Sequence, residues 1–159
     1  MKILAIYTYG YYNLRRDLSK PLNDFRCIQI GFSAVLTNML KKGHSVNLEV
    51  YTQYTNIKKA TREILKDEYD LICVTSVTAH IQIVKSIIRE IKQIKPNIKI
   101  LIGGPHATLF PEDVIKDKNF DALCIGEGFE TINLYLDYLE GKRKADEVTG
   151  FWIRKKEEW

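Results

Sequence analysis

The sequence lacks most of the features that would place the protein in a membrane, outside the cell or around a structural metal. Its three cysteines, Cys27, Cys73 and Cys124, lie far apart in the chain and form no CxxC pair for metal binding or redox chemistry. No run approaches the roughly eighteen apolar residues of a membrane helix, and the first residues lack the cleavage site of a signal peptide. We therefore expect a soluble protein of the reducing cytoplasm.

A strong excess of charge of one sign is also absent. The formal net charge is +4, and the basic residues form only short, separate runs at 41–42, 142–144 and 154–156. This scatter argues against a nucleic-acid-binding surface. With 159 residues, of which 45% are hydrophobic and 28% charged, the chain has the size and composition of one globular domain.

What the sequence does contain is an alternation of short apolar runs and helical patterns. Five runs rich in β-branched and aliphatic residues predict strands at 2–8, 45–50, 71–75, 99–102 and 122–125. Between them, apolar residues at helical spacing predict long helices at 30–42, 79–95 and 130–141, and shorter ones at 56–66 and 111–117.

Two of these helices carry specific expectations. The helix at 30–42 ends at Gly43 and has one apolar stripe, made of Phe32, Val35, Leu36, Met39 and Leu40. Thr78 is placed to cap the helix at 79–95. The buried face of that helix is expected to comprise Val84, Ile87, Ile88, Ile91 and Ile94.

Strands that alternate with helices, and that are apolar on both faces, indicate a parallel sheet covered on both sides. The expected fold is therefore a doubly wound α/β domain over residues 1–147, arranged as a three-layer sandwich. Its sheet is expected to be flavodoxin-like, with five parallel strands in the order 2-1-3-4-5. Residues 148–159 are expected to form a short strand followed by a charged and aromatic segment.

In such a sheet, ligands bind beyond the carboxyl ends of the strands, near the point where the strand order reverses. The loops that follow four of the predicted strands lie at this edge, at 8–13, 75–78, 103–108 and 126–128. Three of them begin with glycine or small residues, which let a ligand approach the backbone closely. One such loop is ordinary turn chemistry, but several at one edge indicate a binding site.

Several functions known for this fold are not expected here, because the residues that carry their chemistry are missing from the sequence. A receiver domain needs acidic residues at the ends of strands 1 and 3, where this chain has Thr8-Tyr9 and Thr75-Ser76. The loop after strand 1 contains only Gly10 in place of GxGxxG, and it is rich in tyrosine where a flavodoxin has serine and threonine. GxxxxGK, HExxH and GxSxG are absent, which argues against nucleotide hydrolysis, zincin chemistry and the hydrolase elbow.

A set of motifs in the second half of the chain points to one family. They are GGPHAT at 103–108, Pro111-Glu112, DALCIGEG at 121–128 with Glu130-Thr131, and GFWIR at 150–154. Together they resemble the cobalamin-binding domain found at the N-terminus of many radical S-adenosylmethionine enzymes. The resemblance covers nearly the whole chain, and GGPHAT followed by GEG at this spacing is its most specific part.

The resemblance implies a domain that lays the corrin ring of cobalamin across the carboxyl edge of the sheet and inserts the nucleotide tail between strands and helices. Four loops would supply the contacts. The implied cofactor-binding residues come from these four loops: Tyr9, Gly10 and Tyr11, where Tyr9 and Tyr11 together with Tyr12 would edge the corrin face; Thr75, Ser76 and Thr78 along the tail; Gly103, Gly104, Pro105 and His106, where the two glycines would admit the tail close to the main chain; and Gly126, Glu127 and Gly128 on its far side.

Two of these residues leave their roles open. His106 either contacts the ligand or makes local hydrogen bonds. Glu127, between two glycines, is expected to accept hydrogen bonds from the backbone rather than to act as a catalytic base. No protein ligand to a metal is expected, because the DxHxxG motif that supplies a histidine to cobalt does not follow strand 1.

The CxxxCxxC motif of an iron–sulfur cluster is absent, so this chain alone cannot perform a radical step. The resemblance implies a further domain, reached through 148–159, that carries a 4Fe–4S cluster and S-adenosylmethionine in an enzyme that transfers a methyl group. The alternative is a domain that keeps the fold, has lost its cofactor and serves as a substrate-recognition or interaction module.

Overall fold

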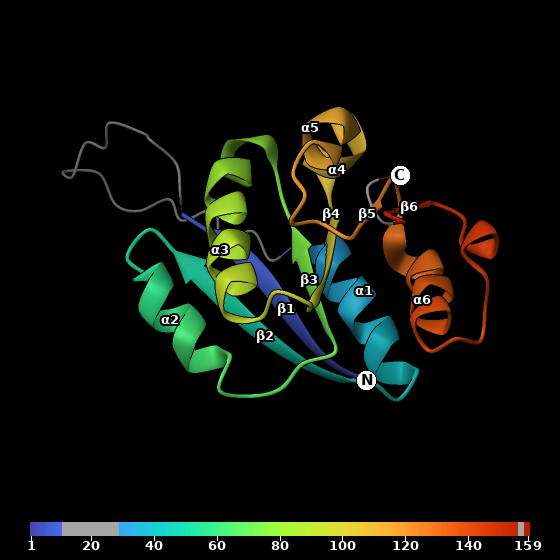
Figure 1. Ribbon diagram of the computed structural model, residues 1–159, viewed down its shortest axis with the longest axis horizontal. Coiled ribbons are helices and arrows are strands. Elements are labelled where there is room, and N and C mark those ends of the chain that lie inside the picture. Colours follow the sequence, from blue (N-terminus) through green and yellow to red (C-terminus); the bar gives the residue numbers. More distant parts are fainter. Residues whose placement is uncertain (11–28, 156–157) are drawn as a thin grey trace.

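The structure, a computed structural model, describes residues 1–10, 29–155 and 158–159. Strands and helices alternate along the chain, as the apolar runs predict (Figure 1). The strands are β1 (Lys2–Tyr9), β2 (Ser45–Thr52), β3 (Leu71–Thr75), β4 (Lys99–Gly103), β5 (Ala122–Cys124) and β6 (Phe151–Ile153).

Six α-helices and two 3₁₀ turns connect these strands in the described part of the chain. They are α1 (Ile30–Lys41), α2 (Ile57–Ile64), η1 (Thr78–His80), α3 (Ile81–Ile94), α4 (Pro105–Leu109), α5 (Pro111–Ile115), α6 (Gly128–Leu139) and η2 (Ala145–Glu147). None of the described helices combines the length and the apolar character needed to cross a bilayer.

The sheet has the order β2-β1-β3-β4-β5-β6. Its first five strands are parallel and follow the predicted order. The prediction of five strands was wrong, because β6 pairs antiparallel with β5, with Phe151 opposite Cys124 and Ile153 opposite Ala122. Residues 151–153 therefore extend the sheet by a sixth strand, which covers the edge that β5 would otherwise expose.

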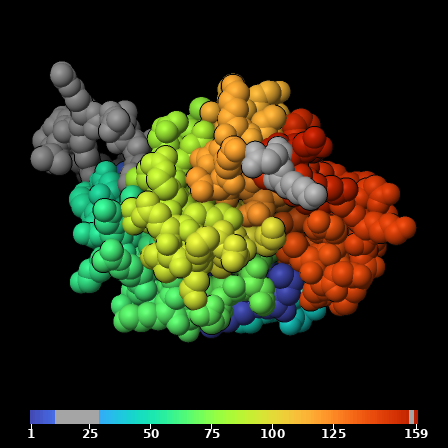
Figure 2. Space-filling model, in the orientation of Figure 1, coloured from blue at the N-terminus to red at the C-terminus, as the bar shows by residue number. Residues whose placement is uncertain are grey.

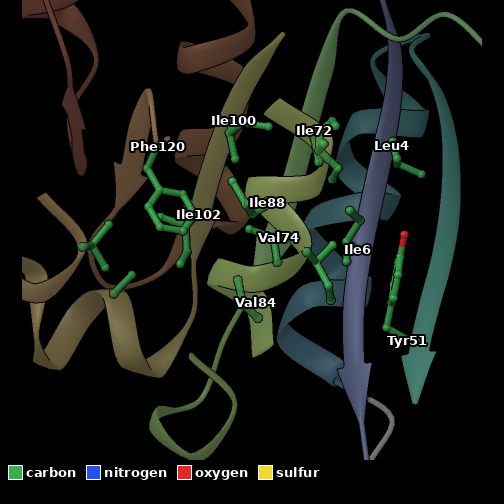
Figure 3. Close-up of a cluster of buried hydrophobic side chains, with 14 of the residues drawn as sticks. Leu4, Ile6, Tyr51, Ile72, Val74, Val84, Ile88, Ile100, Ile102 and Phe120 are labelled. Carbon is green, nitrogen blue, oxygen red and sulfur yellow. The ribbon is translucent and has the colours of Figure 1, made fainter. Parts of the chain in front are cut away.

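One face of the sheet is covered by α2, α3 and the α4–α5 segment. Figure 3 shows the core on this face, where Val84 and Ile88 of α3 pack on the sheet residues Ile72, Val74 and Ile102. Figure 2 shows α3 (yellow-green) and α4–α5 (orange) closing this side of the molecule. Burial here follows the helical period of α3, since Val84, Ile87, Ile88 and Ile91 are fully buried.

The opposite face is covered by α1 and α6, which completes the three layers. Met39 of α1 and Leu136 of α6 are fully buried against sheet residues such as Ala5 and Leu101. Lys42 ties the two helices together, because its ammonium donates to the carboxylate of Asp137 at 2.6 Å. The position of these two helices matters for function, since their N-terminal ends lie at the carboxyl edge of the sheet.

The structure differs from the helix predictions at three residues. Ile94 was expected on the buried face of α3 but is 38% exposed, and Leu40, at the end of the apolar stripe of α1, is 53% exposed, because each lies in the last turn of its helix. Thr78 does not cap α3; it begins η1, and its hydroxyl bonds to His106 instead. The short helix α4 was not predicted, because residues 103–108 have the composition of a turn.

Candidate functional site

A cleft of about 450 Å³ opens at the carboxyl edge of the sheet, on the face covered by α1 and α6. Its floor lies on β3, β4 and β5, and its walls are the first turns of α1 and α6 and the start of α4. This is the edge at which the parallel sheet is expected to bind ligands. The lining residues are Gln29, Gly31, Phe32, Val35, Met39, Cys73, Val74, Thr75, Leu101, Gly103, Gly104, Pro105, Thr108, Leu109, Cys124, Gly126, Glu127, Gly128, Ile132 and Phe151.

The mouth of the cleft depends on glycine at two positions. Gly104 has φ +90°, and a Cβ there would clash with Thr75 Oγ1 and approach the backbone N and O of Ser76 to 3.1 Å. A Cβ at Gly128 would approach Cys124 Sγ to 3.1 Å and reach into the space beside Val35. Backbone conformation and crowding therefore require glycine at Gly104, and the missing side chain at Gly128 keeps the cleft open.

The floor of the cleft is apolar. Met39 and Ile132 are at most 1% exposed, and Phe151 is 8% exposed and stacks on Tyr135 with ring centroids 5.1 Å apart and an interplanar angle of 4°. Sequence reasoning did not assign these residues to the site. The apolar stripe of α1 was the available signal for Phe32, Val35 and Met39, because these three also line the cleft.

Two cysteines contribute to this floor as small apolar groups. Burial raises the pKa of the Cys124 thiol to about 11 and also raises the pKa of Cys73, so both thiols stay protonated at neutral pH. Both are free thiols. Within β3 and β5 they therefore act as small buried hydrophobic residues.

Charge is scarce in the cleft. Among the described residues that line it, Glu127 is the only charged side chain, and none is a lysine or an arginine. Glu127 precedes the first turn of α6, but its carboxylate makes no capping hydrogen bond, so the expectation that it fixes the backbone there was wrong. The first N–H groups of α6 therefore face the cleft mouth without a side-chain acceptor from the N-cap.

His106 belongs to a hydrogen-bonded chain that we call the His106 network, made of Thr78, His106, Asp113 and Lys85. Its imidazole Nδ1 lies 3.2 Å from Thr78 Oγ1, and Nε2 lies 3.1 Å from Asp113 Oδ2. Lys85 Nζ donates to the same carboxylate oxygen at 2.8 Å, and this bond lowers the pKa of Asp113, with a smaller contribution from His106. Of the two roles left open for His106, the structure shows the local one.

The structure brings seven of the predicted residues together around the cleft: Thr75, Gly103, Gly104, Pro105, Gly126, Glu127 and Gly128. The others lie outside its lining. Ser76 is buried and donates to the carbonyl of Val77, and Thr78 and His106 lie in the His106 network. Tyr9 ends β1 and Gly10 follows it, and neither is among the lining residues; Tyr11, like Tyr12, lies outside the described residues.

A metal site built from protein side chains is not found in residues 1–10, 29–155 and 158–159. In these ranges no three histidine, cysteine, aspartate or glutamate side chains come together as metal ligands. The cleft instead suits an organic ligand, since its volume falls within the roughly 300–1,000 Å³ of small-molecule sites and its lining is largely apolar.

These features are those of a domain that holds a large organic cofactor at the edge of a parallel sheet. The family model of the B12 binding domain matches residues 24–135. The chain therefore belongs to the B12-binding domain family, as its motifs predict, and the cofactor of that family is cobalamin.

Curated relatives are much longer than this chain. Cytidylyl-2-hydroxyethylphosphonate methyltransferase of Streptomyces wedmorensis is 27% identical over 94% of this chain and 23% of its own length. An uncharacterized methyltransferase of Pyrococcus horikoshii is 25% identical over 74% of this chain and 26% of its own. The chain thus spans about a quarter of the length of these relatives.

Solved structures show the same fold. The radical S-adenosylmethionine methyltransferase TsrM from Kitasatospora setae superimposes with a TM-score of 0.73 at 13% identity, over 98% of this chain and 28% of TsrM. The cobalamin-dependent S-adenosylmethionine radical enzyme OxsB superimposes with a TM-score of 0.70 at 16% identity, over 99% of this chain and 21% of OxsB. These superpositions confirm a three-layer α/β domain with a mostly parallel sheet.

Proposed function

We propose that the cleft receives the nucleotide tail of cobalamin and that the corrin ring lies across the carboxyl edge of the sheet. The observation that carries this proposal is the cleft itself, which combines a glycine mouth with an apolar floor at the ligand-binding edge of the fold. When bound, the corrinoid supplies a cobalt centre that can carry a methyl group.

Different residues of the cleft would contact different parts of the nucleotide tail. The floor at Val35, Met39 and Ile132 offers apolar surface to an aromatic base, and each Å² removed from water contributes about 25 cal/mol. The N–H groups that begin α1 and α6 offer donors to a phosphate, which needs no basic side chain there. Gly104 lets the tail pass close to the main chain.

The cleft offers no imidazole to the cobalt. None of its lining residues is a histidine, and His106 uses both ring nitrogens within the His106 network. The role of this chain is therefore to bind and orient the corrinoid through its tail rather than to ligate the metal.

The complete protein is, in this proposal, an enzyme that transfers a methyl group. Two of the curated relatives are named as methyltransferases, and TsrM is a radical S-adenosylmethionine methyltransferase whose structure includes cobalamin and a [4Fe-4S] cluster. The cluster and S-adenosylmethionine would belong to a further domain, which this chain reaches through residues 148–159. The strand order and the apolar cleft support only the cofactor-binding part of this proposal.

A direct binding experiment tests the proposal. The purified chain is mixed with hydroxocobalamin and desalted, and the corrin absorbance that stays with the protein is recorded. We expect retention by the natural sequence. Val35→Trp should reduce it at least tenfold, because the indole fills the space beside Gly128.

Leu40→Trp is the matched control, because Leu40 lies on the same helix and is 53% exposed. It should leave retention unchanged. A colourless natural protein would refute the proposal and favour a domain that has lost its cofactor. Equal retention by Val35→Trp, with an intact circular dichroism spectrum, would place the tail elsewhere.

A further inference from the structure

We infer that the outer edge of β2 pairs with the same edge of a second copy of this chain, so that two sheets join across a twofold axis at Leu48. The strand β2 lies at one end of the sheet, and in the described part of the chain it pairs only with β1 (Figure 1). No residue of β2 lines the cleft, so this interface does not depend on the proposed cofactor site.

The edge of β2 is long and lacks the features that usually keep an edge strand from pairing. Its eight residues pair with β1 in an unbroken register, from Lys2 opposite Ser45 to Tyr9 opposite Thr52, and therefore without a bulge. They include no lysine and no proline, the residues that often protect such an edge. An unprotected edge of this length is a template for a further strand.

The backbone groups on the outer side of β2 belong to alternate residues. The N–H of Ser45 donates to the carbonyl of Met1, so Ser45 and the odd-numbered residues that follow it face β1. The N–H of Thr52 donates to the hydroxyl of Thr55 in the turn after the strand, which places the even-numbered residues on the outer side. The outward-facing N–H and C=O groups in the middle of the strand therefore belong to Val46, Leu48 and Val50.

The order of residues along β2 fits antiparallel pairing of the strand with itself. Residues 46–50 read Val-Asn-Leu-Glu-Val, so a twofold axis at Leu48 sets Leu48 opposite its own copy and Val46 opposite Val50 of the second copy. These are the residues with outward-facing backbone groups, and in an antiparallel ladder such pairs exchange both of their N–H···O bonds. Pairing about a twofold axis also closes the assembly at two copies.

The side chains on the two faces of this register are complementary. Leu48 and Val50 are 54% and 43% exposed in the single chain, and in the dimer they lie among copies of the same aliphatic residues. On the other face, Asn47 lies opposite Glu49 of the second copy. The Asn47 amide donates one N–H to Tyr69 Oη at 3.0 Å and has a second N–H for that carboxylate. Glu49 is the only charged residue of β2, so no like charge lies directly opposite it.

Sedimentation velocity of the purified chain at increasing concentration tests for this dimer. One strand pair with two exposed aliphatic side chains per copy makes a small interface, and small interfaces form weak, reversible assemblies, so we expect dimers at about 100 µM that dissociate on dilution to about 1 µM. Leu48→Lys places like charges opposite each other at the axis and should weaken the dimer at least about tenfold. Ile94→Lys is the matched control, because Ile94 is 38% exposed at the end of α3, on the other face of the sheet, and it should leave the dimer unchanged.

A second pair of variants tests the register, in a Cys27→Ser background so that only the buried Cys73 and Cys124 remain of the natural thiols. With diamide as the oxidant, Leu48→Cys should form a disulfide-linked dimer, because the Cα atoms of a hydrogen-bonded pair lie about 5.5 Å apart, within the range of a disulfide. Val50→Cys is the control. Its two copies lie four residues apart along the paired strands, about 14 Å, so it should cross-link at least about tenfold more slowly.

Each contrary result overturns the inference and leaves the proposed function standing, because the cleft does not involve β2. A chain that stays monomeric over the whole concentration range has no such interface. A dimer that Leu48→Lys and Ile94→Lys weaken equally is formed by another surface. Cross-linking of Val50→Cys as fast as that of Leu48→Cys contradicts the axis at Leu48, and this comparison decides the matter even if Leu48→Lys does not fold.

Discussion

Replacing Phe151 by alanine should destabilise the domain more than any other single change in β6. Phe151 is 8% exposed, it lies opposite Cys124 in the sheet, and its ring stacks on the buried Tyr135. The variant loses the buried ring, the stacked pair and the packing between β6 and α6. If residues 148–159 were only a tail of the domain, substitutions in them would change the free energy of unfolding little.

The magnitude follows from the surroundings of the ring. Phe→Ala in a closed core costs about 3–5 kcal/mol. Because Phe151 also borders the cleft, part of the new space joins an opening that water reaches, and we expect the lower part of that range, about 3 kcal/mol. With a urea m-value of about 2 kcal/mol per M, the midpoint should fall by about 1.5 M.

Urea titration followed by far-ultraviolet circular dichroism measures this shift, and Trp152→Ala on the same strand is the control. Trp152 is 42% exposed, so its removal should cost less than half as much. If Phe151→Ala costs less than about 1 kcal/mol, or no more than the control, the sixth strand contributes nothing to the core and our reasoning about β6 is wrong.

Two further predictions concern the mouth of the cleft and the His106 network. Gly104→Ala should lower the unfolding temperature more than Gly141→Ala, because both glycines have positive φ but only Gly104 is crowded. Equal losses in a thermal melt would contradict this. The lowered pKa of Asp113 means that its carboxylate stabilises the fold above the unfolded value of about 3.9 and that this stability disappears as pH falls below it. The difference in urea midpoint between the natural protein and Asp113→Asn, which weakens the bonds to His106 and Lys85, should therefore stay constant above about pH 5 and shrink as the pH falls from about 5 toward 2. A difference that stays constant over that range would refute the assignment.

The parallel part of the sheet could be predicted because its strands are apolar runs separated from one another by segments with a helical pattern. The sixth strand could not be placed, because its three residues, Phe151–Ile153, show no period and their partner β5 is distant in sequence. The helix α4 could not be predicted from the sequence for a different reason. It has five residues and begins with Pro105, so local composition favours a turn.

The site was predictable at its mouth and not at its floor. Glycines at strand ends are visible in the sequence, and Gly103, Gly104, Gly126 and Gly128 all line the cleft. The floor combines β3, β4 and β5 with side chains from α1, α6 and β6, and a residue such as Ile132 looks like any other core residue until the helices are packed. The partner of Thr78 was equally invisible, because His106 lies 28 residues further along the chain.

The mouth and the floor of the cleft differ in how well they tolerate substitution. The mouth is built from glycine, and the floor is built from aliphatic and aromatic residues. Floor residues of similar volume can replace one another at modest cost, whereas Gly104 cannot accept any side chain without disturbing β3. The shape of the cleft mouth therefore depends on the absence of a side chain at Gly104, and substitutions on the solvent-facing helix surfaces leave that shape unchanged.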